Sequence, residues 1–158
     1  MRNASITTKN TMSKARIFLD SSALIAGVLS STGASRVLLV LAEMGDIDLL
    51  ISEHVIVECE RSFAKKVPEA LPELRQTIKD AGLKILKDAS PKEVQASPYV
   101  ISDPDDAPIL VAAIKAKVDF LVTHDRRHFL NDPKVARKSG LQIGTPGDAL
   151  AWLKQRML

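Results

Sequence analysis

Short apolar runs that alternate with stretches of helical periodicity constrain this fold more than any other feature of the sequence. The stretches 16–19 and 119–123 are of strand length, and their apolar residues lie between Arg16 and Asp20 and between Asp119 and Thr123. Between such runs, apolar side chains recur at helical spacing, as in the stretch 109–116, where they fall at i, i+3, i+4 and i+7. Strands that alternate with helices predict an α/β fold: a three-layer α/β/α sandwich with a central, mainly parallel β-sheet.

The same patterns give bounds for individual elements. Gly45 is expected to end one helix, Ser52 to cap the start of another, and Thr145 to cap the last, with Pro146 at its first position. The predicted strands are residues 16–19, 48–51, 83–86, 119–123 and 141–143, with a further short candidate at 99–101. The first predicted helix starts near residue 21, and the later ones include the stretches 37–42, 55–63, 68–82, 109–116 and 150–153.

Length and composition set the general class. The 158 residues suit one domain with a continuous core, and we expect residues 1–15 to be a flexible tail and residues 16–158 to form a single domain. No stretch approaches the roughly 20 apolar residues of a membrane-spanning helix, so no membrane association is expected. The single cysteine, Cys59, excludes an intramolecular disulfide and fits a reducing, cytoplasmic setting.

Four acidic residues stand at positions where a parallel sheet would bring them together. Asp20 and Asp125 follow two apolar strand runs, Asp106 opens a helical pattern, and Glu58 lies inside another. Ligands of open α/β sheets bind outside the carboxyl ends of the strands. Carboxylates crowded there repel each other unless they bind protons or a cation, so the pattern predicts a divalent metal site. Taken singly, each acid also fits a helix cap, a turn or a solvated helix flank.

The charge balance agrees with such a site without requiring it. The formal net charge is +3. If four carboxylates neutralise a bound metal, the remainder of the molecule carries +3 − (−4) = +7. A basic exterior around an acidic pocket would suit a polyanionic substrate, whereas a mildly basic charge is also common in proteins of no such function.

Four segments, in order along the chain, together resemble the PIN domains, a family of metal-dependent ribonucleases that includes the toxins of many prokaryotic toxin–antitoxin pairs. The segments are Leu-Asp-Ser-Ser-Ala-Leu-Ile at 19–25, Ile-Ser-Glu-His-Val-Ile-Val-Glu at 51–58, Asp-Pro-Asp-Asp-Ala-Pro-Ile-Leu at 103–110 and Leu-Val-Thr-His-Asp at 121–125. The segment Ile-Gly-Thr-Pro at 143–146 closes the match, which runs over nearly the whole chain. The resemblance implies a PIN-like fold and hydrolysis of RNA phosphodiester bonds by metal-activated water.

The resemblance also assigns roles to individual residues. Asp20, Glu58, Asp106 and Asp125 would be the catalytic acids and the ligands of one or two Mg²⁺ or Mn²⁺ ions, which prefer hard oxygen donors. Around them, Ser22 and Thr123 would be polar supports; Ser22 stands where many relatives have Asn. Asp103 and Asp105 compete with Asp106 for the third position, and they would otherwise act as outer ligands or helix caps.

The expected partners follow from the same resemblance. RNA would be the substrate, with Arg61, Arg126 and Arg127 as candidate contacts, and a cognate antitoxin and a homodimer are further expectations. Aromatic residues make up only 4% of the chain, so phosphate contacts rather than base stacking should dominate RNA binding. The main alternative is a catalytically silent PIN-fold module that binds RNA or protein. Phosphotransfer enzymes that carry a strand-end Asp fit less well, because a second Asp is missing at position 22.

Overall fold

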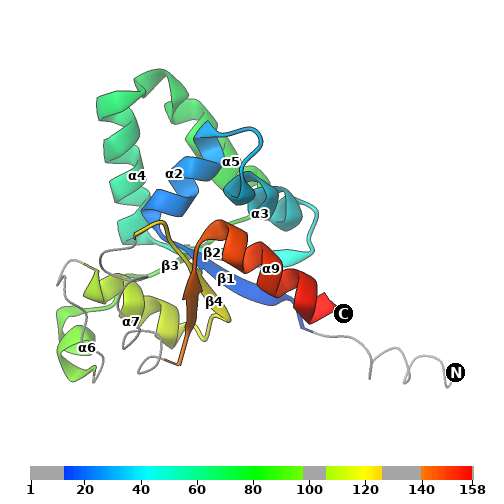
Figure 1. The fold of residues 1–158 in the computed structure, drawn as a ribbon. Helices are drawn as coiled ribbons and strands as arrows, with labels where there is room; N and C mark the ends of the chain where they lie inside the picture. The colour runs from blue at the N-terminus through cyan, green and yellow to red at the C-terminus, as the bar shows by residue number, and fades with distance from the viewer. Residues whose placement is uncertain (1–12, 98–105, 126–139, 158) are drawn as a thin grey trace, which may run out of the picture.

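The computed structural model of the chain describes residues 13–97, 106–125 and 140–157 (Figure 1). Residues 1–12 of the predicted tail at 1–15 lie outside these residues, as does the short strand candidate at 99–101, whereas Ala15 is buried and belongs to the first strand rather than to a tail. The strands are β1 (Ala15–Leu19), β2 (Ile47–Ser52), β3 (Lys84–Leu86), β4 (Phe120–Val122) and β5 (Gln142–Gly144). The helices are α2 (Ser21–Leu29), α3 (Ala34–Glu43), α4 (Glu53–Lys66), the short 3₁₀ helix η1 (Pro68–Ala70), α5 (Leu71–Asp80), α6 (Pro91–Ala96), α7 (Ala107–Lys115) and α9 (Pro146–Met157).

The described strands form one five-stranded sheet in the order β3-β2-β1-β4-β5, and all neighbouring strands are parallel. Helices cover both faces: α2 and α3 lie on one side of the sheet and α6 and α7 on the other (Figure 1). This arrangement confirms the predicted three-layer α/β/α sandwich. The chain runs outward from β1 through β2 to β3 and then returns to the other side of β1 for β4 and β5. The sheet therefore has a topological switch point between β1 and β4, where parallel α/β sheets bind ligands.

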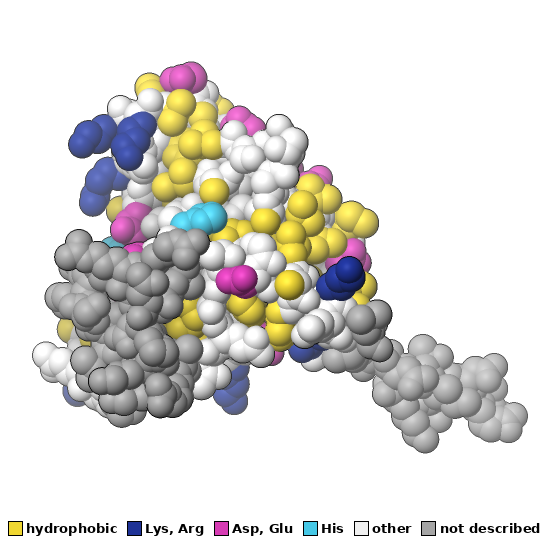
Figure 2. Space-filling model, in the orientation of Figure 1, with side chains coloured by type: hydrophobic (Ala, Val, Ile, Leu, Met, Phe, Trp, Pro, Cys, Tyr) yellow, Lys and Arg dark blue, Asp and Glu magenta, His cyan; other side chains and the backbone are white. Residues whose placement is uncertain are grey.

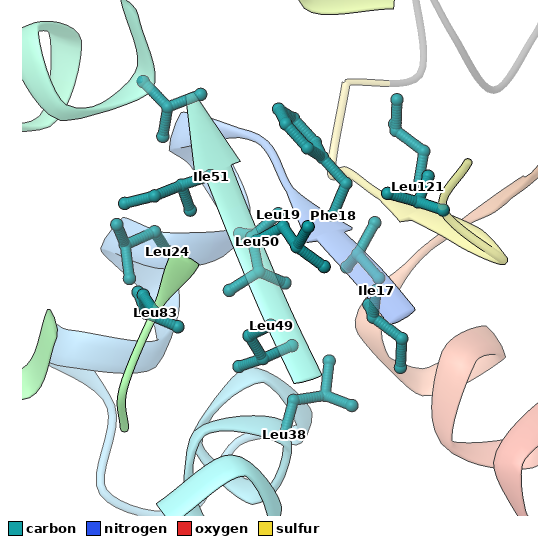
Figure 3. Packing of buried hydrophobic residues seen from close by; sticks show 14 of the residues in the cluster. Ile17, Phe18, Leu19, Leu24, Leu38, Leu49, Leu50, Ile51, Leu83 and Leu121 are labelled. Carbon is teal, nitrogen blue, oxygen red and sulfur yellow. The ribbon is translucent and has the colours of Figure 1, made fainter. Parts of the chain in front are cut away.

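The centre of the sheet is buried on both faces, as expected of a parallel sheet between two helical layers. Ile17, Phe18 and Leu19 of β1 have no exposed surface. In Figure 3, Leu24 of α2 and Leu38 of α3 lie beside Ile51 and Leu49 of β2, whereas Leu121 of β4 lies apart from them on the side of Phe18; all belong to one buried core. Because β1 is enclosed from both sides, its last residue and the one that follows it are fixed in position.

Local sequence signals account for most helix ends. Gly45 adopts φ +84°, and its amide donates to the carbonyl of Ala42 after α3. A residue with a Cβ would be strained in this left-handed conformation, which explains why the helix ends at a glycine. The hydroxyl of Ser52 accepts from the amide of Val55 and caps α4, as predicted.

The final helix begins as predicted, with a pair of reciprocal capping hydrogen bonds. The amide of Asp148 donates to Thr145 Oγ1 at 3.1 Å, and the amide of Thr145 donates to Asp148 Oδ2 at 3.0 Å. Pro146 occupies the first helical position, where its missing N–H costs nothing. Thr145 is therefore fixed directly after the edge strand β5.

Three predictions of local structure differ from the structure. The single helix expected at 68–82 is divided into η1 and α5, because Pro72 can only occupy the first turn of a helix and α5 therefore begins at Leu71. The last strand is shifted by one residue, to Gln142–Gly144, and the other four strands differ from their predicted bounds by one residue at one or both ends. Helix α6 is not predicted at all, although Ser90, Pro91 and Glu93 form a complete capping box at its start.

No single helix among the described residues is long and apolar enough to span a membrane. Helices α2 and α3 pass that test of length and composition only as a pair, and they are bent by 87° at the break between them.

Candidate active site

Asp20 lies at the switch point and is one of the few buried polar side chains among the residues that the structure describes. It follows β1 directly, is 5% exposed and caps α2. Its Oδ1 accepts from the amide of Ala23 at 3.0 Å and from Ser22 Oγ at 2.7 Å, and its Oδ2 accepts from Thr123 Oγ1. The carboxylate is therefore fixed by three donors and cannot rotate without breaking several hydrogen bonds.

Two hydroxyls tie this carboxylate to the chain that leaves β4. Ser22 Oγ also accepts from the amide of His124 at 3.0 Å, and Thr123 Oγ1 accepts from the amide of Asp125 at 2.9 Å. The register explains the meeting, since Leu19 pairs with Val122 and the next residue of each strand is Asp20 or Thr123. Each hydroxyl thus donates to Asp20 and accepts from the loop that carries Asp125.

Glu58 approaches the same edge of the sheet from α4. Its Oε1 accepts from Ser21 Oγ at 3.2 Å and lies 3.5 Å from His54 Nε2, one turn earlier on the helix. The side chains of Glu58 and His54 are 40% and 38% exposed. Beneath Glu58, Cys59 is fully buried and its Sγ lies 3.7 Å from the carbonyl oxygen of Ser21. These contacts join the start of α2 to the middle of α4.

The acidic groups of this site lie close enough to shift the pKa values of their neighbours. Burial raises the pKa of Asp20 above its usual value, hydrogen bonds from Thr123, Ser22 and the Ala23 amide oppose that rise, and the charge of Asp125 adds to it. Burial, with the charges of Glu58 and Asp20, raises the pKa of the Cys59 thiol to about 12. Negative charge is therefore unfavourable at the centre of the site, and a bound cation would relieve it.

Asp106 stands at the head of α7, as the sequence predicts. It is the N-cap residue and is half-buried, but its side chain makes no capping hydrogen bond. Within residues 13–97, 106–125 and 140–157, no group of three or more His, Cys, Asp or Glu side chains is placed to hold one metal ion. The four-acid metal site therefore stays a prediction. The other predicted residues Asp103, Asp105, Arg126 and Arg127 lie outside the described residues, and Arg61 is exposed on α4.

The donor set around Asp20 nevertheless fits a hard divalent cation. A carboxylate offers roughly four acceptor sites on its two oxygens, and here three donors occupy three of them. Oδ2 accepts from one described donor and retains capacity for a ligand. With Asp125 close enough to raise the pKa of Asp20, these oxygens are of the kind that Mg²⁺ and Mn²⁺ prefer.

Ser21 and His54 have no predicted role, yet both contact Glu58. The position of His54 could have been recognised, because residues four apart on a helix are neighbours. Ser21 gives no such signal, since its contact with Glu58 joins two helices 37 residues apart.

A hollow of about 380 Å³ opens beside the acidic cluster at the same edge of the sheet. His124 lines the hollow together with Ser30 at the end of α2, Ser35 at the start of α3 and Thr145 just before α9. The site is therefore open to solvent on the side of His124.

Comparison with known proteins gives one family match. A model of the PIN domain family matches residues 16–127. The structure of VapBC2 from Rickettsia felis bound to a DNA fragment from their promoter is similar, with a TM-score of 0.56 and 18% identity over 81% of this chain and 96% of that chain. PAE2754 from Pyrobaculum aerophilum gives a TM-score of 0.59 and 19% identity over 89% and 90% of the two chains.

A domain of a functionally unknown protein from Methanocaldococcus jannaschii has a TM-score of 0.50 and 21% identity, over 83% of this chain and 90% of that one. At these identities the similarity to solved structures concerns the fold. No curated protein sequence matches the chain.

Proposed function

The chain belongs to the PIN-domain family, and on that premise we propose that it is a metal-dependent endoribonuclease and the toxin of a toxin–antitoxin pair. The observation that carries the proposal is the buried carboxylate of Asp20, held at the switch point of the sheet by two hydroxyls and an amide. A carboxylate in that position is poorly solvated and next to a second acid, Asp125, which favours a cation as its partner. The shared fold with VapBC2 from Rickettsia felis supports the toxin assignment.

Four acids would hold the metal in this proposal. Asp20 and Asp106 are the main ligands, Asp125 completes the site directly or through water, and Glu58 holds a second ion or positions the attacking water. A bound Mg²⁺ or Mn²⁺ supplies activation of water for attack on a phosphodiester and neutralisation of the charge that develops on the phosphate.

The other residues of the site orient these carboxylates. Ser22 and Thr123 fix both oxygens of Asp20 and at the same time fix the loop of Asp125. Ser21 and His54 limit the directions in which Glu58 can point. Such outer contacts set the geometry of metal ligands, and losing one costs about 10- to 100-fold in metal affinity or activity.

The competing proposal is a catalytically silent PIN-fold module that binds RNA or protein. One observation favours it: the carboxylate of Asp20 already accepts three hydrogen bonds, one of them from the Ala23 amide in the first turn of α2. On that reading, the hydrogen bonds of Asp20 would serve only to cap α2 and join it to β4.

We also propose the wider setting expected from the sequence: a single domain at residues 16–158, a cytoplasmic location, an antitoxin partner and a homodimer. The exposed apolar side chains of Val37, Val40 and Met44 recur at i, i+3 and i+7 along α3, which gives a second copy of the chain a stripe to pack against. A monomeric mass in solution would contradict the dimer.

The test is cleavage of a mixed pool of structured and single-stranded RNAs with Mn²⁺, with Mg²⁺ or with EDTA. We expect cleavage to need metal and to fall by more than about 100-fold in Asp20→Asn, since a metal ligand should matter more than an outer contact. Asp46→Asn is the matched control, because Asp46 is exposed and precedes β2 at the opposite edge of the sheet. Loss of cleavage in Asp20→Asn, with cleavage kept in Asp46→Asn, supports the nuclease.

Two outcomes of this test would change the proposal. A folded wild-type protein that neither cleaves RNA nor binds metal would exclude the nuclease and favour the silent module. A folded protein that binds metal without cleaving the pool would restrict the substrate to an RNA outside the pool or point to a retained inhibitor.

A further inference from the structure

One face of α4 carries a line of charged side chains that starts at the candidate active site. Successive helical residues are turned by about 100°, so His54, Glu58, Arg61 and Lys65 fall within an arc of about 60°. Lys66 is the next residue, but it points about 100° away from Lys65. Arg61 and Lys65 therefore share the face of Glu58, whereas Lys66 does not.

The cations on this face have no acidic partner among the described residues. Other exposed cations do: Arg75 lies 3.0 Å from Glu60, and Lys84 lies 3.2 Å from Asp48. None of the ion pairs formed within residues 13–97, 106–125 and 140–157 involves Arg61, Lys65 or Lys66, and all three side chains are exposed. Their charge is thus available to a partner from outside the chain.

The positive charge of α4 extends along the helix, away from the acidic residues at the strand ends. Helix α4 rises from the sheet with its N-terminal end at the strand ends, and Lys and Arg side chains gather over its side of the molecule (Figures 1 and 2). A favourable interaction with the helix dipole accounts for lysines in the last turn, but it would apply equally to Lys65 and Lys66. It does not explain why Arg61 and Lys65 align with Glu58.

The spacing suits the backbone of a nucleic acid strand. At 1.5 Å per residue, Arg61 lies about 4.5 Å and Lys65 about 10.5 Å along the helix from Glu58. One strand of a DNA duplex advances by about 3.4 Å per nucleotide along its axis, so on that scale the two cations stand roughly one and three nucleotides from Glu58. Phe63 of this helix is buried, and the ring that the face exposes is the imidazole of His54, which lies beside Glu58. Arg61 and Lys65 can therefore contact phosphates, with no ring between them on which a base could stack.

We propose that a single-stranded segment of the RNA lies along this face of α4, with its phosphates at Arg61 and Lys65. The inference rests on the proposed ribonuclease function and adds the path by which the strand leaves the catalytic acids. Such contacts are independent of sequence, so they determine affinity and position rather than the choice of target.

The test compares Lys65→Gln with Lys66→Gln, two adjacent variants of equal charge. Binding of a fluorescein-labelled oligouridylate is measured by fluorescence anisotropy in EDTA, where cleavage does not interfere, over a range of KCl concentrations. Each phosphate contact on a single strand contributes about 0.7 to the slope of log K against log salt. We expect Lys65→Gln and Arg61→Gln each to weaken binding severalfold and to make the negative slope shallower by about 0.7, and Lys66→Gln to match wild type.

Three results would overturn the proposal. Equal losses in Lys65→Gln and Lys66→Gln would mean that only net charge matters. Unchanged slopes in Lys65→Gln and Arg61→Gln would remove RNA from this face. A Lys65→Gln variant that loses affinity for an oligoglutamate peptide but keeps its affinity for the oligouridylate would make the face a docking surface for protein.

Failure of this inference can be distinguished from failure of the proposed function. Metal-dependent cleavage by wild type together with a wild-type salt slope in Lys65→Gln refutes only the path along α4. A shallower salt slope in Lys65→Gln, together with a wild-type protein that cleaves no RNA with any metal, refutes only the nuclease. Thermal unfolding of each variant confirms that these exposed substitutions leave the fold intact.

Discussion

Asp20 and Glu58 reach the same edge of the sheet from two regions that hold their carboxylates differently. Asp20 is 5% exposed and accepts hydrogen bonds from three donors, two on α2 and one on Thr123, which follows β4. Glu58 has a side chain that is 40% exposed, and its two contacts come from Ser21 at 3.2 Å and His54 at 3.5 Å. The fold itself holds the buried carboxylate in one position, whereas the exposed carboxylate is held by two weaker contacts. Substitutions around the two carboxylates should therefore differ in their effects on the free energy of unfolding and on function.

The largest expected effect on stability comes from Thr123→Val. Valine keeps the shape of the side chain but removes the donor to Asp20 Oδ2 and the acceptor for the Asp125 amide, both within a fully buried position. Leaving buried polar groups without a partner costs about 1–3 kcal/mol of the free energy of unfolding, to be measured by denaturant unfolding. Thr77→Val is the matched control, since the Thr77 hydroxyl makes no hydrogen bond with any described residue. A loss as small as that of the control would contradict the central role of the Thr123 hydroxyl.

A smaller effect is expected from pH. Because the pKa of Asp20 is raised in the folded state, folded protein binds the proton more readily than unfolded chain does. The stabilisation from protonated Asp20 is complete below the ordinary aspartate pKa of 3.8 and is lost as pH rises through the higher pKa of the folded state. Asp20→Asn should therefore gain stability relative to wild type as pH rises through that window.

Measuring the free energy of unfolding of both proteins at several acidic pH values checks this sign. A difference between Asp20→Asn and wild type that does not change with pH would show that the ionised carboxylate is not unfavourable where it lies. Asp46→Asn, at an exposed position, should show no such trend.

The smallest effect on stability is expected at Glu58. Ser21→Ala and His54→Gln each remove one partner from a partly exposed carboxylate, and exposed pairs contribute about 0.2–1 kcal/mol. Under the proposed function, the two variants should cleave RNA clearly more slowly while their free energies of unfolding change little. The carboxylate of Glu58 would no longer be oriented, but the fold would be kept. Cleavage rates and unfolding free energies of the two variants would test this. Losses as large as that of Thr123→Val would remove the distinction between the two regions.

The same distinction explains what the sequence could predict. The strand ends that carry Asp20 and Thr123 follow from apolar runs, and the helix starts at Ser52 and Thr145 follow from capping residues. These are local signals, and they locate the strand ends that bear the rigid part of the site. The order of the strands, which places β4 beside β1, is a long-range property that no local pattern encodes.

The contacts of Glu58 were less accessible to prediction for a similar reason. Its partner Ser21 belongs to another helix, and only packing of α2 against α4 brings the two side chains together. Helix α6 was a different kind of failure, because its capping box at Ser90 and Glu93 is visible in the sequence but its six residues contain no buried side chain. Without an apolar face, a short helix gives no periodic pattern.

The burial of Cys59 between these two regions has a consequence for measuring motion. With a pKa of about 12, only about one thiol in 10⁵ is ionised at neutral pH, and the side chain has no exposed surface. Alkylating reagents can reach this sulfur only when the chain around it opens locally, since Cys59 lies against Ser21 at the start of α2. The rate at which the single thiol is labelled under native conditions therefore reports local opening of the contact between α2 and α4.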